Sequence, residues 1–399
     1  MTSALINYSL GEVCRVINGR AYKQSELLDD GKYRVLRVGN FFSNNSWYYS
    51  DLELNEDKYC ENGDLLFAWS ASFGARIWSK EKVIYHYHIW KMLPNEKIID
   101  KTFLFYLLMS KTNSFMDSTH GSIMLHLTKT FMEELVLSFP KSLNIQKQIA
   151  KVLSNLDAKI ELNNKINTEL EAMAKLIYDY WFVQFDFSDE NGKPYKSSGG
   201  KMVYNEELKR EIPDGWESGE LTDIANITMG QSPPGNSYNE EGVGEVFYQG
   251  CTDFGGRFPT NRKFTTKPSR FAKKGDILLS VRAPVGTMNV ANEDCCIGRG
   301  LAALNSKDNC ISYLDGVLQY MKQIFDRRNS SGTTFGSITK GDLFSLSVVK
   351  PNEGILKRFD AIAKPMFDKQ NIIGLENQKL AELRDWLLPM LMNGQVRVK

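Results

Sequence analysis

The sequence is poor in the side chains that most often hold metals. Its 399 residues include six cysteines and four histidines, and no two cysteines form a Cys-x-x-Cys pair. His86 and His88 are separated by a single tyrosine, but two ligands do not complete a zinc site. The sequence therefore predicts buried free thiols and a packed histidine pair rather than a zinc centre or a redox motif.

Long hydrophobic runs are also absent. No run of about eighteen apolar residues occurs, and the N-terminus lacks the basic-then-apolar pattern of a signal peptide. We therefore expect a cytoplasmic protein that makes no membrane contact. The net charge of +1 excludes no class of partner, because acidic helices elsewhere can balance a basic face. The length suits two domains, each able to bury a core.

Signatures of catalysis are missing as well. No Gly-x4-Gly-Lys-Ser/Thr loop occurs, and Pro213-Asp214 belongs to an Ile-Pro-Asp-Gly-Trp turn rather than to a nuclease motif. The segment 232–235, Ser-Pro-Pro-Gly, half-imitates the loop with which amino-methyltransferases hold a flipped base. Gly235 replaces the aromatic residue of that loop, and no Phe-x-Gly-x-Gly loop for a methyl donor is present. We therefore interpret 232–235 as a turn.

Two long helical runs organise the chain. In residues 144–180, one heptad position holds Ile149, Leu156, Leu170 and Ile177, and the position three residues later holds Val152, Ile166, Met173 and Tyr180. In residues 352–392, the matching sets are Phe359, Met366, Ile373, Leu380 and Leu387, then Ile362, Leu383 and Met390. At about 1.5 Å per residue, each helix is longer than one domain needs for its own core. We therefore expect the two to pair as an internal antiparallel coiled coil.

Polar residues and a proline interrupt these runs. Asn163 falls on the heptad position of Leu156 and Leu170, where it either fixes the register or lies exposed because the seam is short. Lys369 and Glu376 break the second seam in the same way. Pro365 removes a backbone donor, which predicts a kink near residues 361–364.

Three blocks of sequence occur twice, in the same order and at one offset. SLGEVCRVINGRA (9–21) aligns with ELTDIANITMGQS (220–232), and NGDLLFAWSASFG (62–74) aligns with KGDILLSVRAPVG (274–286). HGSIMLHLTKTFMEELVLSFP (120–140) aligns with SGTTFGSITKGDLFSLSVVKP (331–351). The offsets are 211, 212 and 211, and a long helical run follows each copy. The chain is therefore an internal repeat.

The repeat predicts an α+β fold: two similar α/β domains separated by two long antiparallel coiled-coil helices about a pseudo-twofold axis. The first domain is expected at 1–141, its helix at 142–184, and a polar Gly- and Ser-rich linker at 185–211. The second domain is expected at 212–351 and its helix at 352–399. Two heads held at a fixed distance suit a divided linear target, of which duplex DNA with half-sites about 34 Å apart is the leading case.

The chain resembles the specificity subunit of type I restriction-modification enzymes over essentially its full length. The resemblance is carried by the doubled Gly-Asp-Leu/Ile strand, the SITK…VKP block, the EIPDGWE opening (211–217), the MGQSPPG turn (229–235) and the WFVQFDF…NGKPYKSSGGK passage. The first domain departs from this pattern, since it lacks the Ile-Pro-Asp-Gly-Trp opening and has SASFG where the second has RAPVG. These differences fall where different targets would be read.

The resemblance implies a non-catalytic DNA-binding subunit. Its partners would be double-stranded DNA, two methyltransferase subunits docked on the helices, and translocase-nuclease subunits. S-adenosylmethionine, and ATP with Mg²⁺ for restriction, would be bound by those partners rather than by this chain. Apolar residues outside the seam are expected to dock the methyltransferases: Leu153, Ile160, Ile372 and Trp386.

Loops next to the repeated blocks carry the candidate DNA contacts, because Lys and Arg bind phosphates while Arg, Gln, Ser and Thr read base edges. In the first domain they are Arg20, Tyr22, Ser70, Ser72, Arg76, His120, Ser122 and Lys129. In the second they are Gln231, Ser232, Arg282, Arg299, Ser331, Thr333, Thr334 and Lys340. For each residue, the alternative is an ordinary solvated loop side chain. The alternatives for the whole chain are a self-contained DNA methyltransferase and a tandem coiled-coil scaffold whose heads bind protein.

Overall fold

The computed structural model describes residues 5–43, 46–70, 72–118, 127–330 and 336–398, without the side chains of 113–118, 324 and 327–330. The chain forms two compact units. The first combines Met1–Lys159 with Leu380–Lys399, and the second is Ile160–Lys379. Each unit therefore contains part of both long helices.

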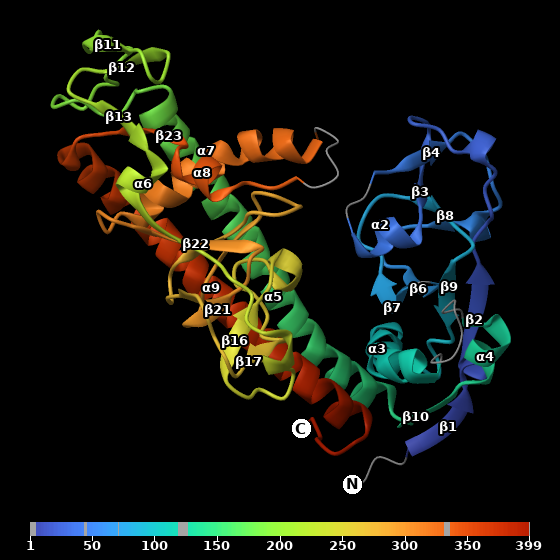
Figure 1. Cartoon of the computed structure of the whole chain (residues 1–399). Helices are drawn as coiled ribbons and strands as arrows, with labels where there is room; N and C mark the ends of the chain where they lie inside the picture. Colours follow the sequence, from blue (N-terminus) through green and yellow to red (C-terminus); the bar gives the residue numbers. More distant parts are fainter. Residues whose placement is uncertain (1–4, 44–45, 71, 119–126, 331–335, 399) are drawn as a thin grey trace. The chain divides into compact units, whose positions relative to one another are not determined.

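The first unit is built on two four-stranded sheets (Figure 1). One sheet is antiparallel, with the order β2 (Cys14–Asn18), β9 (Ile89–Pro94), β6 (Leu65–Ser70), β7 (Ser72–Ile77). The other has the order β4 (Tyr48–Ser50), β3 (Tyr33–Leu36), β8 (Val83–Tyr85), β5 (Tyr59–Cys60), and its β3–β8 pair is parallel. Around them lie β1 (Leu5–Ser9), β10 (Val136–Pro140), α1 (Leu10–Val13), α2 (Val38–Phe42), α3 (Lys101–Ser118) and α4 (Lys129–Glu134).

Strand β6 explains the continuous apolar run after Gly63. Leu65 and Phe67 belong to the core that α3 and α5 (Leu143–Tyr178) cover, whereas Leu66 and Ala68 belong to a second core with Leu36. Successive residues of a strand point to opposite faces, so a strand with a core on each side must be apolar at every position.

The second unit repeats this plan with a larger second sheet. Its antiparallel sheet has the order β14 (Ala225–Met229), β22 (Leu301–Ser306), β19 (Ile277–Ser280), β20 (Met288–Val290). The five-stranded sheet has the order β15 (Tyr238–Asn239), β17 (Phe264–Thr265), β16 (Glu245–Tyr248), β21 (Cys295–Ile297), β18 (Phe271–Ala272). Its remaining elements include β13 (Glu217–Glu220), β23 (Ser347–Lys350), α6 (Leu221–Ile224), α7 (Ile311–Ser330) and α8 (Lys340–Phe344).

Strand register confirms the internal repeat. Cys14 pairs with Pro94 as Ala225 pairs with Ser306, and Leu65 pairs with Met92 as Ile277 pairs with Leu304. The parallel pair Leu36–Tyr85 corresponds to Tyr248–Ile297. A one-residue slip would turn the apolar face of a strand to solvent, so the shared register reflects the shared apolar pattern. The fold is α+β, with two similar domains joined by two long helices.

The long helices are antiparallel within each unit. In the first unit Asp157 of α5 forms an ion pair with Arg384 of α9 (Glu353–Met392) at 2.9 Å, and Leu153 shares a core with Leu391. In the second unit Asn163 donates to Asn377 at 2.9 Å, and Tyr178 lies against Phe359. Helix α5 ends in one π turn, Asp179–Val183, while α9 is helical throughout, including Pro365.

The sequence predicted one of the two heptad positions of the seam correctly and the other wrongly. Ile149, Phe359 and Ile373 are buried as expected, whereas Met173, Tyr180, Ile362 and Leu383 are exposed. The second buried position lies four residues after the first, at Leu153 in α5 and at Ala363 and Leu391 in α9. Residues three and four apart share a helix face, so apolar spacing alone did not decide between them.

This shift corrects part of the expected docking surface. Leu153 is fully buried in the core of the first unit, so it cannot contact a partner. Ile160 lies on the same buried stripe of α5, seven residues further, and is half-buried. Ile372 and Trp386 are exposed as expected.

The stretch between the repeats carries structure of its own. Phe185 and Phe187 pack on Trp216 in the core of the second unit, and β11 (Met202–Asn205) pairs with β12 (Arg210–Pro213). Between these anchors, residues 188–201 form turns with mostly exposed side chains.

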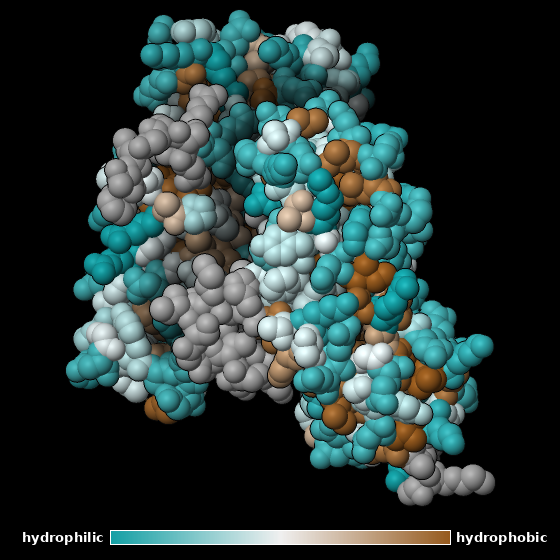
Figure 2. Space-filling model, turned by 90° about the vertical axis from the view of Figure 1, so that its right-hand side faces the viewer, coloured by the Kyte–Doolittle hydropathy of each residue, from teal (hydrophilic) through white to brown (hydrophobic). Residues whose placement is uncertain are grey.

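The expectation of buried free thiols is confirmed. All six cysteines are free, and each except the half-buried Cys251 is buried. Burial raises the pKa of the Cys310 thiol to about 11, so that thiol is neutral and unreactive at neutral pH. The face drawn in Figure 2 is mainly hydrophilic, with separate apolar patches. Among the described helices, none is both long and apolar enough to traverse a bilayer.

Candidate nucleic-acid interface

Loops from distant parts of the second unit converge on one place. They are the turns after β14, β16, β19 and β21 and the segment before α8. Backbone hydrogen bonds join them: Gly230 N to Leu301 O (2.9 Å), Gln231 N to Ile297 O (3.0 Å), Gly298 N to Tyr248 O (2.8 Å), Val281 N to Gly300 O (2.9 Å) and Ile338 N to Val281 O (2.9 Å). We call this set of loops the second loop cluster.

The first unit contains the same cluster, built with the same backbone bonds. They are Gly19 N to Ile89 O (3.2 Å), Arg20 N to Tyr85 O (3.1 Å), His86 N to Leu36 O (2.9 Å), Trp69 N to His88 O (3.1 Å) and Leu127 N to Trp69 O (3.2 Å). Each donor and each acceptor lies 211 or 212 residues before its counterpart in the second unit. The first and second loop clusters are therefore equivalent in backbone and different in side chains.

Glycine is required where the first turn of each cluster meets the last strands. A Cβ atom at Gly19 would lie 2.3 Å from the carbonyl oxygen of His86, and one at Gly230 would lie 2.2 Å from that of Gly298. No side chain fits at these distances, so both turns keep glycine. This close approach explains the glycine shared by the first pair of repeated blocks.

Most of the candidates in the second unit lie in its loop cluster. The side chains of Gln231, Arg282 and Arg299 are exposed there, and Arg282 forms a β-bridge with Ser337. The Ser232 hydroxyl accepts a hydrogen bond from the Gln249 amide at 2.8 Å, which fixes both side chains. Lys340 is also exposed, at the start of α8, with its Nζ 5.1 Å from the Phe344 ring.

The candidates of the first unit divide into two groups. Ser72, Arg76 and Lys129 are exposed, and the guanidinium carbon of Arg76 lies 5.5 Å from the centre of the Phe41 ring. Lys129 forms a helical ion pair with Glu133. These three side chains remain candidates for DNA contact.

The other group is engaged within the protein. Arg20 donates two hydrogen bonds to Glu26, at 2.8 and 3.0 Å, and this pairing lowers the pKa of Glu26 to about 2. Ser70 is 5% exposed and the Tyr22 hydroxyl is buried, so both predictions of a direct contact are wrong. Alternation along β6 and stacking of Tyr22 on His86 place these groups inside.

Five other predicted residues lie outside the described part of the chain: His120, Ser122, Ser331, Thr333 and Thr334. In the sequence they precede Leu127 and Ile338, at equivalent places in the two repeats. Their role stays a prediction.

One site in the first loop cluster was missed by the sequence analysis. A pocket of about 430 Å³ is lined by Arg37, Asn40, Tyr48, His86 and His88, among others. Arg37 follows β3 directly, and its counterpart in the second unit is Gln249, after β16. The sequence contained a signal for this site, because a polar residue directly after a buried strand often binds a ligand.

The two histidines pack against each other, and the segment 232–235 forms part of a turn. The His86 and His88 rings pack with their centroids 4.7 Å apart, and no cluster of three metal-binding side chains occurs among the described residues. In segment 232–235, the Pro233 carbonyl accepts a hydrogen bond from the Tyr238 hydroxyl and the Pro234 carbonyl one from Ser237 N. Both carbonyls are thus used inside a turn.

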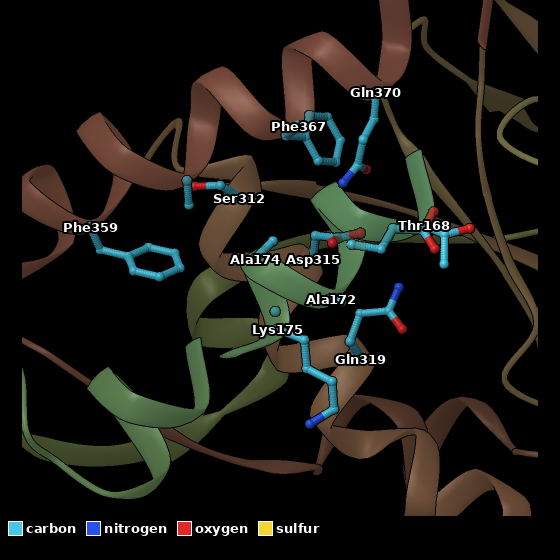
Figure 3. Close-up of a pocket in the computed structure, with 13 residues that line it drawn as sticks. Thr168, Ala172, Ala174, Lys175, Ser312, Asp315, Gln319, Phe359, Phe367 and Gln370 are labelled. Atoms are coloured by element: carbon cyan, nitrogen blue, oxygen red, sulfur yellow. The ribbon is translucent and has the colours of Figure 1, made fainter. Parts of the chain in front are cut away.

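A pocket of the second unit lies away from these loops. Side chains from α5, α7 and α9 surround a cavity of about 260 Å³ (Figure 3). Its most perturbed group is Asp315, because burial raises the pKa of its carboxyl to about 6 despite the opposing effect of Arg257. Glu171 of α5 also lines the cavity, and its partial burial raises the pKa of its carboxyl. The pocket is lined by both polar and apolar side chains and lies outside the loop cluster.

Comparison with known families identifies the family to which the chain belongs. Residues 6–172 and 213–385 each match the family model described as type I restriction modification DNA specificity domain. The chain belongs to this family of specificity subunits. The two matches correspond to the two halves of the repeat. Membership sets this specificity subunit apart from self-contained DNA methyltransferases.

Individual relatives agree with the family. The chain is 32% identical to the putative type I restriction enzyme MjaX specificity subunit of Methanocaldococcus jannaschii, over 80% of this chain and 73% of that one. It is 23% identical to the type I restriction enzyme HindI specificity subunit of Haemophilus influenzae, over 98% and 99%. The crystal structure of the type I restriction-modification S subunit from M. genitalium has the same fold, with a TM-score of 0.58 and 18% identity over 98% and 96% of the two chains.

Proposed function

We propose that this specificity subunit reads a bipartite DNA target and has no catalytic activity of its own. Each loop cluster reads one half-site in the major groove, and the paired helices set the spacer. The observation that carries the proposal is the doubled loop cluster, in which one backbone pattern holds two different sets of exposed polar side chains. Rigid loops with exchangeable side chains are suited to sequence readout.

The charge of the exposed candidates supports this function. Arg282, Arg299 and Gln231 combine phosphate-binding and base-reading chemistry in the second cluster. Ser72, Arg76 and Lys129 supply comparable groups in the first unit. Two clusters with unlike side chains would read unlike half-sites, so the target is expected to be asymmetric.

The exposed faces of the helices support docking of two methyltransferase subunits. At an offset of 210, the offset that aligns the two helices, three exposed apolar residues of α5 have exposed apolar counterparts in α9. These pairs are Leu162 with Ile372, Met173 with Leu383 and Leu176 with Trp386, and all six side chains are 43% to 66% exposed. Large apolar side chains kept exposed at equivalent positions indicate two copies of one contact surface.

Chemistry is assigned to the partners. S-adenosylmethionine would be bound by the methyltransferase subunits, and ATP with Mg²⁺ by the restriction subunits of the complete complex. The turn that half-imitates a methyltransferase loop supports this division, because Gly235 offers no ring to stack on an extruded base and the carbonyls of Pro233 and Pro234 are already bonded.

Methylome sequencing of the host, with and without this gene, tests the proposal. We expect a split, asymmetric methylated motif that disappears when the gene is deleted. Loss of an uninterrupted motif, or no loss, would contradict the two-cluster mechanism. Methyl transfer by the isolated chain supplied with S-adenosylmethionine would instead show a self-contained methyltransferase.

A further inference from the structure

The pocket of the first loop cluster holds an arginine with no partner of opposite charge. Arg37 is exposed at the end of β3 and forms no ion pair with any carboxylate in the described part of the chain. Its Cζ lies 5.0 Å from the centre of the Tyr48 ring, which supports one face of the guanidinium. Arg20, by contrast, is neutralised by Glu26.

The other polar side chains of the pocket are one amide, two hydroxyls and two imidazoles. No lining residue is acidic. Burial, with smaller effects of His88 and Arg37, lowers the pKa of His86 to about 4, so His86 is neutral at neutral pH. Its Nδ1 accepts a hydrogen bond from the main-chain N–H of His88 at 3.5 Å, which leaves the proton on Nε2. The pocket therefore presents N–H groups to whatever enters it.

The position of Arg37 in the cluster is fixed by the backbone. The bond from His86 N to Leu36 O places Arg37 beside the turn after β8, as the bond from Gly298 N to Tyr248 O places Gln249 beside the turn after β21. Arg37 and Gln249 therefore occupy the same structural position in the two units. Of the four bases, only guanine presents two acceptors, N7 and O6, in the major groove, and arginine matches them with two donors.

We infer that Arg37 reads a guanine in the half-site of the first unit by donating to its O6 and N7, and that position 37/249 determines specificity in both clusters. The glutamine in the second cluster matches the acceptor and donor of adenine, N7 and the 6-amino group. Its amide is held in place by Ser232. This inference rests on the proposed function, because it assumes that the loop clusters face the major groove.

Modified bases test the contact without changing the protein. The complex of this chain with its methyltransferase subunits is titrated with its methylome-defined target, in which each guanine in turn is replaced by 7-deazaguanine, which lacks the N7 acceptor. We expect one guanine of one half-site to weaken binding by about 5- to 150-fold. Inosine at the same position, which keeps O6 and N7, is expected to have little effect.

Variants assign the effect to Arg37. In the Arg37→Ala complex, 7-deazaguanine at that position should add no further loss. In the Gln249→Ala complex, the matched control, the full penalty should remain. Arg37→Gln should shift the preferred base at that position from guanine towards adenine, as measured by binding to the four base pairs.

Other results would overturn the inference. A 7-deazaguanine penalty that persists in Arg37→Ala would assign the N7 contact to another side chain. An equal loss of affinity of that variant for specific and unrelated DNA would show a phosphate contact instead. A first half-site in which no guanine is sensitive to replacement by 7-deazaguanine would also overturn the inference. If the unaltered complex did not distinguish its target from unrelated DNA, the proposed function itself would be wrong. If the complex did distinguish them, but neither Arg37→Ala nor 7-deazaguanine changed the binding, only this inference would be wrong.

Discussion

The side chains of the loop clusters divide into a set that is engaged within the protein and a set of exposed candidates for DNA contact. Tyr22 and Ser70 are polar in the sequence but are buried by their local packing. Arg282 and Arg299 stay exposed because their turns leave the sheet. The repeated blocks mark the loops that converge in each cluster, and their role in DNA contact stays a prediction. The sequence did not predict which hydroxyl faces inward, because a neighbour such as Glu26 or His86 becomes adjacent only in the folded chain.

Arg282 provides a direct test of readout at one half-site. We expect Arg282→Ala to weaken binding of the complex to one half-site by about 1–3 kcal/mol, because its guanidinium is exposed in the second cluster only. Binding is measured on targets that carry substitutions in one half-site at a time. An equal loss on unrelated DNA would indicate a phosphate contact.

Asp315 makes the stability of the second unit depend on pH. A folded pKa of about 6, above the ordinary value of 3.8, means that the folded state binds the proton more tightly. Protonation of this carboxyl therefore adds to the free energy of unfolding. The added stability is complete below about pH 4 and is lost as the pH rises through about 6. Asp315→Asn should raise the free energy of unfolding at pH 7.5 by about 1 kcal/mol. This value is smaller than the full pKa shift implies, because solvent partly screens a carboxyl that lines two pockets.

Thermal unfolding at pH 4.5 and 7.5 measures this effect. The gain in Tm should appear at pH 7.5 and shrink at pH 4.5. Asp308→Asn, at an exposed carboxylate of the same unit, serves as the control and should shift Tm little at either pH. A gain of the same size at both pH values would assign the change to packing instead.

At the level of elements, the long helices show where a periodic pattern is informative and where it is not. The pattern predicted both helices and one heptad position, and it left open whether Asn163 is exposed. The structure buries Asn163 to 1% exposure, with hydrogen bonds to Glu376 and Asn377. Burial of a bonded asparagine favours the register role over the exposed alternative. The second buried position of the seam could not be predicted from the pattern, because it depends on how each helix is rotated about its own axis. Packing against the partner helix determines that rotation.

Asn163 should therefore stabilise the helix pair. We expect Asn163→Ala to lower the free energy of unfolding by about 1–3 kcal/mol, because it leaves Glu376 and Asn377 without this donor. Asn164→Ala is the matched control, since Asn164 is exposed and accepts a single bond from Asn377. Chemical denaturation distinguishes the two, and equal losses would contradict a special role for the buried amide.

The exposed apolar faces predict a stoichiometry. Leu176→Ser and Trp386→Ser each remove one member of an equivalent pair, so each should cost the complex one methyltransferase subunit rather than both. Native mass spectrometry of the assembled complex counts the subunits. Val243→Ser, at an exposed valine outside the helices, is the control. Retention of two subunits by both helix variants would place the docking surface elsewhere.

The whole molecule is a reader duplicated within one polypeptide, with α5 and α9 shared by both units. The order of the blocks and their offset of 211–212 residues predict this plan. The recognised bases could not be predicted in the same way, because they depend on a few side chains at positions such as 37 and 249. Those positions became equivalent only when the backbone bonds of the two clusters were compared.

Altering the helices should alter the spacer. Insertion or deletion of whole heptads in both α5 and α9, which keeps their pairing in register, is expected to change the number of base pairs between the half-sites while leaving each half-site unchanged. Methylome sequencing of cells that carry the variants reports both quantities. An unchanged spacer would show that the helices do not set the distance.

The backbone bonds of the loop clusters have an evolutionary consequence. Since main-chain hydrogen bonds join the loops of each cluster, the exposed side chains of these loops are under little constraint from folding. New target preferences can then arise by substitution at a handful of sites, or by exchange of a whole half between related genes, with little risk to solubility. A host would thus acquire a new methylation pattern in one step, while its methyltransferase subunits would still dock on the same helices.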